Sequence, residues 1–435
     1  MSDDMISRLI RIAIVSKGGI KCKECKKRKI MDENHETCQL CYEIFRLNLS
    51  GNEVIDDIIR NTRVNFVTDS KCCILEFVPY DQFKNIEFIA EGGFSKIYKA
   101  IWVDGPISEY LTSSNNTIVR NNDYTFKVYY QILSNGSSYN VIKYFGITQD
   151  PITKDMMIIM PYYSSGDLIH HLSNNFYNVS WITKLVQLYH TISGLLLIHR
   201  AKIIHRDLHS GNILFDNYYA YIGDLGISRS ATDLNNDNEK YGIIPYMAPE
   251  IFQGQKYTEA SDIYSFGMIM WEFMTGRRPL WDEIHDIELI IKICDGLRPP
   301  IVTNAPEGYI ELMKECWHSD PEKRPTADNI FWKIYKMCDN ERYRNQTKII
   351  KSSNIGPVTI NNPGAIYKSR PLSCMIQSAI SLRSSRSLSI DPFYYYQKNT
   401  DKRKLEDDSV EESNDNEQSI KRRKFIENEN ENSGE

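Results

Sequence analysis

The sequence lacks any apolar run that approaches the roughly 18–20 residues of a membrane-spanning helix. We also expect no secretory signal. Residues 5–15 are apolar but contain Arg8 and Arg11, whereas a signal peptide has an uninterrupted apolar centre. Ten cysteines in 435 residues are too few for a disulfide scaffold and favour a reducing compartment. A net charge of −5 argues against nucleic acid as a partner. These absences predict a cytoplasmic or nuclear protein without a membrane partner.

Composition distinguishes three segments of the chain, with a linker between the first two. Residues 1–50 are rich in cysteine and lysine, and residues 51–82 are expected to form a linker. Residues 83–338 alternate strand-like and helix-like stretches with enough apolar residues for a core. Residues 345–435 are rich in Ser, Asn, Lys and Glu, so they are expected to be disordered because they cannot bury enough apolar surface. Two basic clusters in this tail resemble a nuclear import signal, although a solvated tail has the same composition.

Three short motifs carry the chemistry, and they follow one another in the segment 83–338. They are His-Arg-Asp-Leu-His-Ser-Gly-Asn at 205–212, Asp-Leu-Gly at 224–226 and Ala-Pro-Glu at 248–250. Phosphoryl transfer needs a carboxylate that accepts the proton of the acceptor hydroxyl, and oxygen ligands that hold Mg²⁺ against the phosphates. Asp207 suits the first role, and Asn212 and Asp224 suit the second.

The order and spacing of these motifs resemble those of protein kinases. Residues 83–338 resemble a eukaryotic protein kinase domain of the tyrosine-kinase-like, Ser/Thr-directed group. The resemblance implies an α+β fold with two lobes, one small and β-rich, the other mainly helical. It also implies an ATP-binding Ser/Thr kinase in signal transduction, which transfers the γ-phosphate of ATP to hydroxyls of protein substrates. Glu250 and Arg324 would form a buried ion pair, and Asp262 would hold the backbone of the 205–212 loop.

The resemblance further implies a nucleotide site in the small lobe. A glycine-rich turn lets backbone N–H groups approach phosphates closely. The residues expected to contact ATP are Ala90, Gly92, Gly93, Ser95, Ile97, Met160, Pro161, Tyr163 and Leu214. His209 stands where the family has lysine or arginine, and it would steady the γ-phosphate less strongly because imidazole is charged only when protonated. The alternative for His209 is a polar loop residue without a role.

The small lobe departs from the family pattern. An active kinase pairs a lysine on the third strand with a glutamate on the following helix. The sequence has no glutamate from residue 110 to residue 238. If residues 117–120 form the third strand, Arg120 replaces the lysine, and residues 124–130 then end the helix with Thr125 in the glutamate's place.

This departure leaves the activity open. Lys96 or Lys127 is an alternative partner for the phosphates, because a lysine is a movable point charge on a flexible stem. The alternative to an active enzyme is a pseudokinase, a scaffold that binds nucleotide or partner proteins without turnover.

The amino-terminal segment has a metal-binding pattern. Two Cys-x-x-Cys pairs, twelve residues apart, offer four thiolates to a structural Zn²⁺, namely Cys22, Cys25, Cys38 and Cys41. His35 is an alternative ligand, and free thiols or disulfides are the alternatives to a metal. Lysines surround these cysteines, so a zinc-dependent nucleic-acid binder is a third hypothesis for the protein.

Overall fold

The computed structural model describes residues 21–24, 26, 36–68, 74–91, 96–107, 125–128, 140–230, 239–343, 346–358 and 362–386. The chain divides into the units Met1–Arg383 and Ser384–Glu435, and the fold described here belongs to the first, apart from the last three described residues, 384–386. None of the described helices is both long enough and apolar enough to cross a membrane. Several residues singled out in the sequence lie outside the described ranges, namely Cys25, His35, Gly92, Gly93, Ser95 and residues 117–120.

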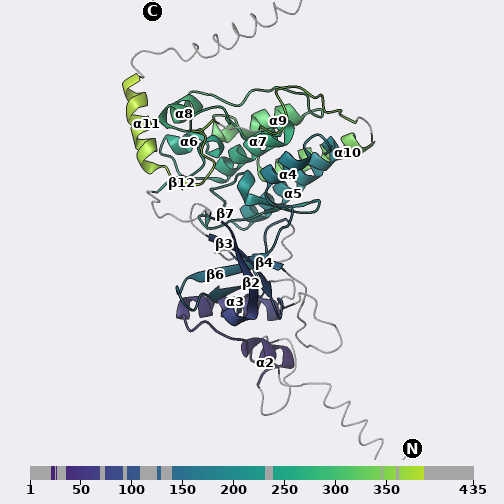
Figure 1. Ribbon diagram of the computed structural model, residues 1–435, viewed down its shortest axis with the longest axis vertical. Helices are drawn as coiled ribbons and strands as arrows, with labels where there is room; N and C mark the ends of the chain where they lie inside the picture. Colours follow the sequence, from purple (N-terminus) through teal and green to yellow (C-terminus); the bar gives the residue numbers. More distant parts are fainter. Residues whose placement is uncertain are drawn as a thin grey trace, which may run out of the picture. The chain divides into compact units, whose positions relative to one another are not determined.

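The small lobe, whose strands β2, β3, β4 and β6 are labelled in Figure 1, is built on one sheet. This sheet has six strands in the order β1-β5-β6-β4-β3-β2. Its strands are β1 (Glu76–Phe77), β2 (Phe83–Glu91), β3 (Lys96–Trp102), β4 (Thr125–Val128), β5 (Gly146–Gln149) and β6 (Met156–Pro161), and the 3-10 turn η1 (Tyr80–Gln82) joins the first two. Only β1 pairs in parallel, with β5. Strand β6 is apolar and buried at Ile158, Ile159 and Met160, as expected of a central strand covered on both faces.

Strand β4 corrects the sequence interpretation of residues 124–130. They were expected to end a helix, but Thr125–Val128 is a strand between β3 and β6. In this register Lys127 lies opposite Lys99 on one side and Met160 on the other. Counted from β2, the first strand of the segment 83–338, β4 is the third strand; it carries Lys127, so the chain does not lack this strand. Thr125 is part of the strand and does not occupy a helix position.

A helix from the amino-terminal part covers the β5–β6 region. Helix α2 (Gln39–Phe45) is followed by α3 (Glu53–Thr68), which lies in the segment expected to be a linker. Ile55 and Ile59 of α3, one helical turn apart, belong to the same buried cluster as Met160. The four-residue spacing of these apolar side chains gives α3 a face that the sheet buries.

The large lobe is helical and surrounds two long buried helices. Its helices are α4 (Leu168–Asn175), α5 (Trp181–Arg200), α6 (Pro249–Phe252), α7 (Glu259–Thr275), α8 (Ile287–Cys294), α9 (Tyr309–Cys316) and α10 (Ala327–Tyr343). Its short elements are β7 (Ile203–Ile204), η2 (Ser210–Asn212), β8 (Ile213–Asp216), β9 (Tyr219–Ile222), β10 (Arg229–Ser230), β11 (Tyr241–Gly242), η3 (Ile244–Tyr246) and η4 (Pro321–Lys323). Helix α7 begins with a capping box between Thr258 and Ser261 and ends at Gly276, which has a left-handed φ of 72°. The α+β, two-lobed fold expected from the sequence is confirmed.

The segment after α10 differs from the expected disordered tail. Within residues 362–386, which we call the C-terminal strap, β12 (Arg370–Pro371) pairs with β11, and α11 (Ser373–Arg386) runs beside α6 and α8 (Figure 1). Leu372, Ile376 and Ala379 are buried in the large-lobe core. They recur at intervals of four and three residues, so one face of the strap is apolar although its average composition is polar.

Candidate active site

The loop that follows β7 is held by a carboxylate from the buried helix α7. Asp262 accepts hydrogen bonds from the backbone N–H groups of His205 (2.8 Å) and Arg206 (2.9 Å). Arg206 has a φ of 73°, a left-handed conformation that is unfavourable for a residue with a side chain. The two bonds to a buried carboxylate stabilise this turn, which confirms the role expected of Asp262.

This loop meets the Asp-Leu-Gly motif. Asn212 donates from its side-chain Nδ2 to the backbone carbonyl oxygen of Asp207 (2.8 Å). The backbone carbonyl oxygen of Asn212 accepts from the N–H of Gly223 (2.8 Å). His205 Nε2 lies 3.0 Å from the carbonyl oxygen of Gly223. Asp224 has a left-handed φ of 55° and accepts from the N–H of Gly226 (3.1 Å). The bonds from Asn212 to Asp207 and to Gly223 therefore hold the 205–212 loop against the residue that precedes Asp224.

Asp207 and His209 form a buried polar pair. His209 Nε2 lies 3.6 Å from Asp207 Oδ2, and Nδ1 accepts from the N–H of Gly211 (3.1 Å), so the ring proton is assigned to Nε2. Burial raises the pKa of Asp207, but His209 and the hydroxyl of Ser369 outweigh it, so this pKa lies below its usual range. Burial lowers the pKa of His209, but Asp207 outweighs it and this pKa lies above its usual range. Asp207 is therefore ionised at neutral pH and accepts hydrogen bonds.

A residue that the sequence did not point to completes this pair. Ser369 of the strap donates its hydroxyl to Asp207 Oδ2 at 2.6 Å, and its Oγ lies 3.3 Å from His209 Nε2. The contact spans 162 positions of the chain. No local motif surrounds Ser369, so only the tertiary structure reveals it.

The adenine-side residues of the sequence prediction divide into two groups. Met160, Tyr163 and Leu214 are buried in one apolar cluster, and Pro161 ends β6 beside them in the chain. Ala90 and Ile97 lie opposite each other in the β2–β3 ladder, Ala90 exposed and Ile97 half-buried. The structure thus brings Met160, Tyr163 and Leu214 together in one cluster. It separately pairs Ala90 of β2 with Ile97 of β3.

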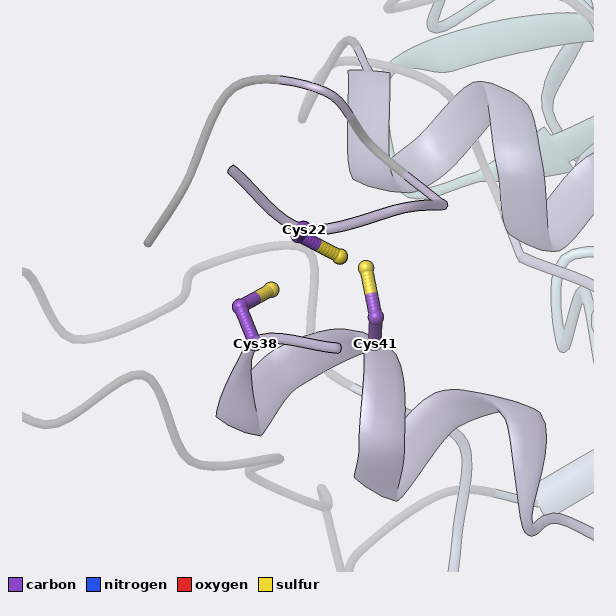
Figure 2. A group of neighbouring side chains, drawn as sticks. All are labelled: Cys22, Cys38 and Cys41. Atoms are coloured by element: carbon purple, nitrogen blue, oxygen red, sulfur yellow. The ribbon is translucent and has the colours of Figure 1, made fainter. Parts of the chain in front are cut away.

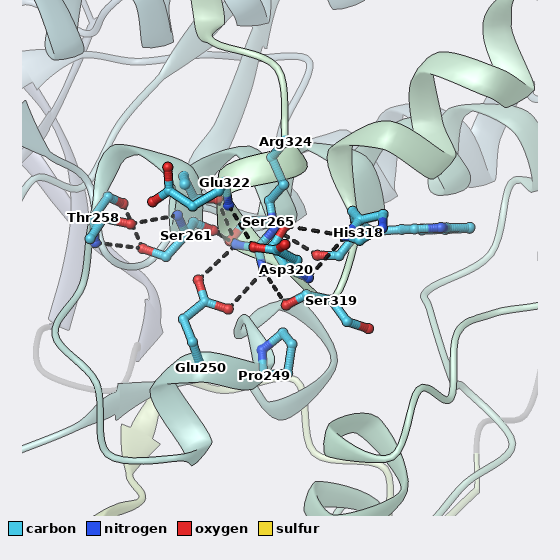
Figure 3. Close-up of polar contacts among 12 residues, drawn as sticks. Pro249, Glu250, Thr258, Ser261, Ser265, His318, Ser319, Asp320, Glu322 and Arg324 are labelled. Carbon is cyan, nitrogen blue, oxygen red and sulfur yellow. Dashed lines mark hydrogen bonds and ion pairs between the residues drawn. The ribbon is translucent and has the colours of Figure 1, made fainter. Parts of the chain in front are cut away.

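A buried ion pair supports the large lobe (Figure 3). Arg324 donates from both terminal nitrogens to the two carboxylate oxygens of Glu250, each at 2.7 Å. Arg324 also donates to the backbone oxygens of Ala260 (2.9 Å) and His318 (2.8 Å). The bidentate geometry confirms the expected pair and ties α6 to the segment around η4.

Three of the four predicted cysteine ligands meet near the amino-terminal end (Figure 2). The Sγ atoms of Cys22, Cys38 and Cys41 lie within 4.8 Å of one another, and all three side chains are buried. Thiolates around zinc at about 2.3 Å are about 3.8 Å apart in a tetrahedron. Three converging buried thiols therefore fit a structural zinc ion, with Cys25 outside the described residues.

Comparisons with known proteins agree with the two-lobed fold. The family model described as protein tyrosine and serine/threonine kinase matches residues 83–334, more than half of the 435 residues. A Dictyostelium discoideum protein named as a probable serine/threonine-protein kinase is 29% identical over 272 residues, which are 59% of this chain and 15% of that protein. Stress-activated protein kinase alpha of the same organism is 28% identical over 282 residues, covering 61% of this chain and 43% of the relative.

A third Dictyostelium discoideum relative, named as a probable LIM domain-containing serine/threonine-protein kinase, is 26% identical over 293 residues, 67% of this chain and 44% of the relative. The chain thus spans less than half the length of each of these three proteins. The match to the family model, together with the two-lobed fold and the assembled 205–212 and 224–226 motifs, shows that the chain belongs to the protein tyrosine and serine/threonine kinase family.

Proposed function

We propose that this protein is a Ser/Thr protein kinase that uses ATP and Mg²⁺ to phosphorylate hydroxyls of protein substrates in signal transduction. The observation that carries the proposal is a serine hydroxyl 2.6 Å from the carboxylate of Asp207, in the loop that also holds Asn212. A general base must lie within hydrogen-bond reach of the proton that it removes, and Asp207 satisfies this condition with a hydroxyl of the right chemical class.

In the proposed reaction the acceptor oxygen attacks the γ-phosphorus of ATP. The new O–P bond forms as the bond from the γ-phosphorus to the β-phosphate bridging oxygen breaks, and ADP leaves. The hydroxyl proton passes to Asp207. His209 holds its Nε2–H near the acceptor oxygen, a positioning role that does not require a charged ring.

Asn212 and Asp224 would hold the metal. Because Asn212 uses Nδ2 to bind the carbonyl of Asp207, its Oδ1 is the atom that is suited to ligate a cation. Asp224 supplies a carboxylate from the adjoining segment. Mg²⁺, when bound there, neutralises charge between the β- and γ-phosphates.

The nucleotide would lie between the two lobes' strands, against the residues from β2, β3, β6 and β8. We assign its contacts to Ala90, Gly92, Gly93, Ser95, Ile97, Met160, Pro161, Tyr163 and Leu214. Lys127 now takes the place of the third-strand lysine, because β4 lies between β3 and β6. This position supports turnover over the pseudokinase alternative, which rested on the missing lysine–glutamate pair; it supplies the lysine of that pair, while the sequence has no glutamate from residue 110 to residue 238.

The zinc site is proposed as a structural element of the same protein. Cys22, Cys38 and Cys41, with Cys25, would leave no open coordination position, so the ion would take no part in the reaction. A reducing compartment, cytoplasmic or nuclear, is consistent with this use of thiols.

The test is phosphate transfer by the full-length chain. With Mg²⁺ and labelled ATP the chain should phosphorylate casein, and Asp207→Asn should reduce the rate by about 10²–10⁴-fold because it removes the base. ATP should still raise the melting temperature of Asp207→Asn, because the nucleotide contacts remain.

The matched control is Asp155→Asn, which changes an exposed carboxylate in the turn before β6 and should leave the rate unchanged. If ATP raises the melting temperature of the unaltered chain but no phosphate is transferred to any acceptor, the protein is a nucleotide-binding scaffold.

A further inference from the structure

The C-terminal strap is anchored to the large lobe before it reaches the active site. Asn362 donates its N–H to the carbonyl oxygen of Trp281 (3.0 Å), and Gly364 accepts from the N–H of His285 (3.0 Å). Tyr367 donates its hydroxyl to the carbonyl oxygen of Pro279 (2.9 Å). These bonds place the chain immediately before Ser369 on the α7–α8 connection.

The strap is anchored again directly after Ser369. Strand β12 pairs antiparallel with β11, with Gly242 opposite Arg370. The N–H of Leu372 donates to the carbonyl oxygen of Lys240 (2.7 Å), and the N–H of Lys240 donates to Ser373 Oγ (2.8 Å). Leu372 is fully buried, so a hydrophobic anchor adds to the backbone pairing.

Strand β11, with which β12 pairs, lies in the segment between the Asp-Leu-Gly and Ala-Pro-Glu motifs. An extended peptide that adds a strand to an exposed edge is a common mode of peptide recognition. The strap resembles this mode, because β12 pairs with β11 in a two-stranded ladder and residues on both sides of Ser369 are held. Its geometry is that of a bound peptide with one serine presented to Asp207.

The presented hydroxyl is also oriented for reaction. The 2.6 Å separation between Ser369 Oγ and Asp207 Oδ2 is typical of an O–H group that donates to a carboxylate. His209 Nε2–H faces the same oxygen from 3.3 Å. The proton of Ser369 therefore points to the proposed base, and a lone pair of Oγ remains for attack on phosphorus.

We propose that Ser369 is a phosphoacceptor of the chain's own active site, and that the docked strap occupies the site where other protein substrates bind. This inference rests on the proposed kinase function. Ser369 Oγ attacks the γ-phosphorus of ATP, its proton passes to Asp207, the bond to the β-phosphate oxygen breaks and ADP leaves. The product is phosphoserine 369 on the same chain.

The experiment maps phosphates on the full-length chain by mass spectrometry after incubation with Mg²⁺ and ATP. Ser369 should be phosphorylated with a rate constant that does not change on dilution, because the acceptor is delivered within the chain. Asp207→Asn should lower this rate by about 10²–10⁴-fold. Ser369→Ala should lack the phosphate, whereas the control Ser378→Ala, on the same strap but bonded within α11, should retain phosphate at Ser369.

A second readout needs no nucleotide. The N–H of Leu372 should exchange with solvent slowly in the ATP-free chain, because it is bonded to Lys240 in the docked strap. Rapid exchange would show that the strap does not dock and would overturn the inference.

The remaining outcomes separate this inference from the proposed function. Phosphorylation of casein without phosphate on Ser369, or a rate for Ser369 that rises in proportion to protein concentration, overturns the intramolecular acceptor and leaves the kinase function standing. Absence of transfer to both casein and Ser369 overturns the proposed function, and the inference with it.

Discussion

Lys184, on α5, is the clearest case of a single residue whose burial has an energetic cost. Its side chain is buried, and among the described residues its Nζ has no hydrogen-bond partner. The Nζ atom lies 3.7 Å from the ring centroid of Phe176 and 5.2 Å from that of Trp181. The aromatic faces attract the cation, but burial still lowers the pKa of Lys184 to about 7.

The depressed pKa makes the effect of Lys184 on stability depend on pH. An unfolded lysine titrates near 10.4, so between about pH 7 and pH 10.4 the unfolded state holds a proton that the folded state has lost. The free energy of unfolding therefore rises with pH across this window. The destabilisation caused by burying Lys184 is largest at and below pH 7, where the side chain is charged in both states. Lys184→Met should raise the free energy of unfolding by about 2–4 kcal/mol at pH 7 and by much less near pH 10.

The measurement is urea unfolding at both pH values. Lys256→Met, which replaces an exposed lysine, is the control and should show no difference between them. An equal gain for Lys184→Met at pH 7 and pH 10 would show that the pKa of Lys184 is normal.

Candidate site residues that lie in local motifs could be picked out from the sequence. Residues whose place in the site depends on a contact with a distant part of the chain could not. Asp207, Asn212 and Asp224 lie within twenty positions of one another in motifs whose spacing is diagnostic. Lys127 was considered only as an alternative because residues 124–130 were interpreted as the end of a helix. Ser369 carries no local signal, because its role comes from a contact across 162 positions.

Among the elements, α3 shows how a segment outside the family match supports the nucleotide side of the small lobe. Ile59 is fully buried in the cluster that also contains Met160 and Leu214. Replacing a buried isoleucine by alanine costs about 2–5 kcal/mol. Ile59→Ala should therefore destabilise the small lobe by that amount and weaken the rise in melting temperature on ATP addition.

Val54→Ala is the matched control, since Val54 lies on the same helix and is 71% exposed. Its stability should be within about 0.5 kcal/mol of the unaltered chain. Equal stabilities of the two variants by calorimetry would mean that α3 does not pack against the sheet in solution.

Two of the three elements that the sequence misassigned, α3 and the strap, were missed for the same physical reason. Helix α3 and the strap each contribute a few buried apolar residues to a core formed by other segments. The average composition of each segment is dominated by its polar residues. The first segment was therefore interpreted as a linker and the second as a disordered tail. Only contact with a partner surface shows which of their residues are buried.

Over the molecule as a whole, the cysteine cluster is continuous with the small lobe. Cys22, Cys38 and Cys41 share a buried cluster with Ile74, next to β1, and Ile107, which follows β3. The N–H of Ile107 donates to Glu76 Oε1 at 3.1 Å, within the same region. The sequence predicted a separate module followed by a linker, but these contacts join the module to the sheet.

Zinc removal should therefore affect the small lobe as well as the first 50 residues. Purified chain should contain about one Zn²⁺, and chelation should unfold the amino-terminal segment because metal binding supplies its folding energy. Chelation should also weaken the melting-temperature rise on ATP addition, since the small lobe loses a packed neighbour. The large lobe has its own core around α5 and α7 and should unfold at an unchanged temperature.

Two cysteine variants test this coupling. Cys22→Ser should reproduce the effects of chelation without a chelator, whereas Cys374→Ser, which changes an exposed thiol on α11, should bind zinc and ATP normally. Chain that purifies without metal and does not respond to added Zn²⁺ would identify the cluster as ordinary buried thiols. Loss of zinc with an unchanged response to ATP would instead show that the metal site and the nucleotide site are energetically independent, despite the shared apolar cluster around Ile74 and Ile107.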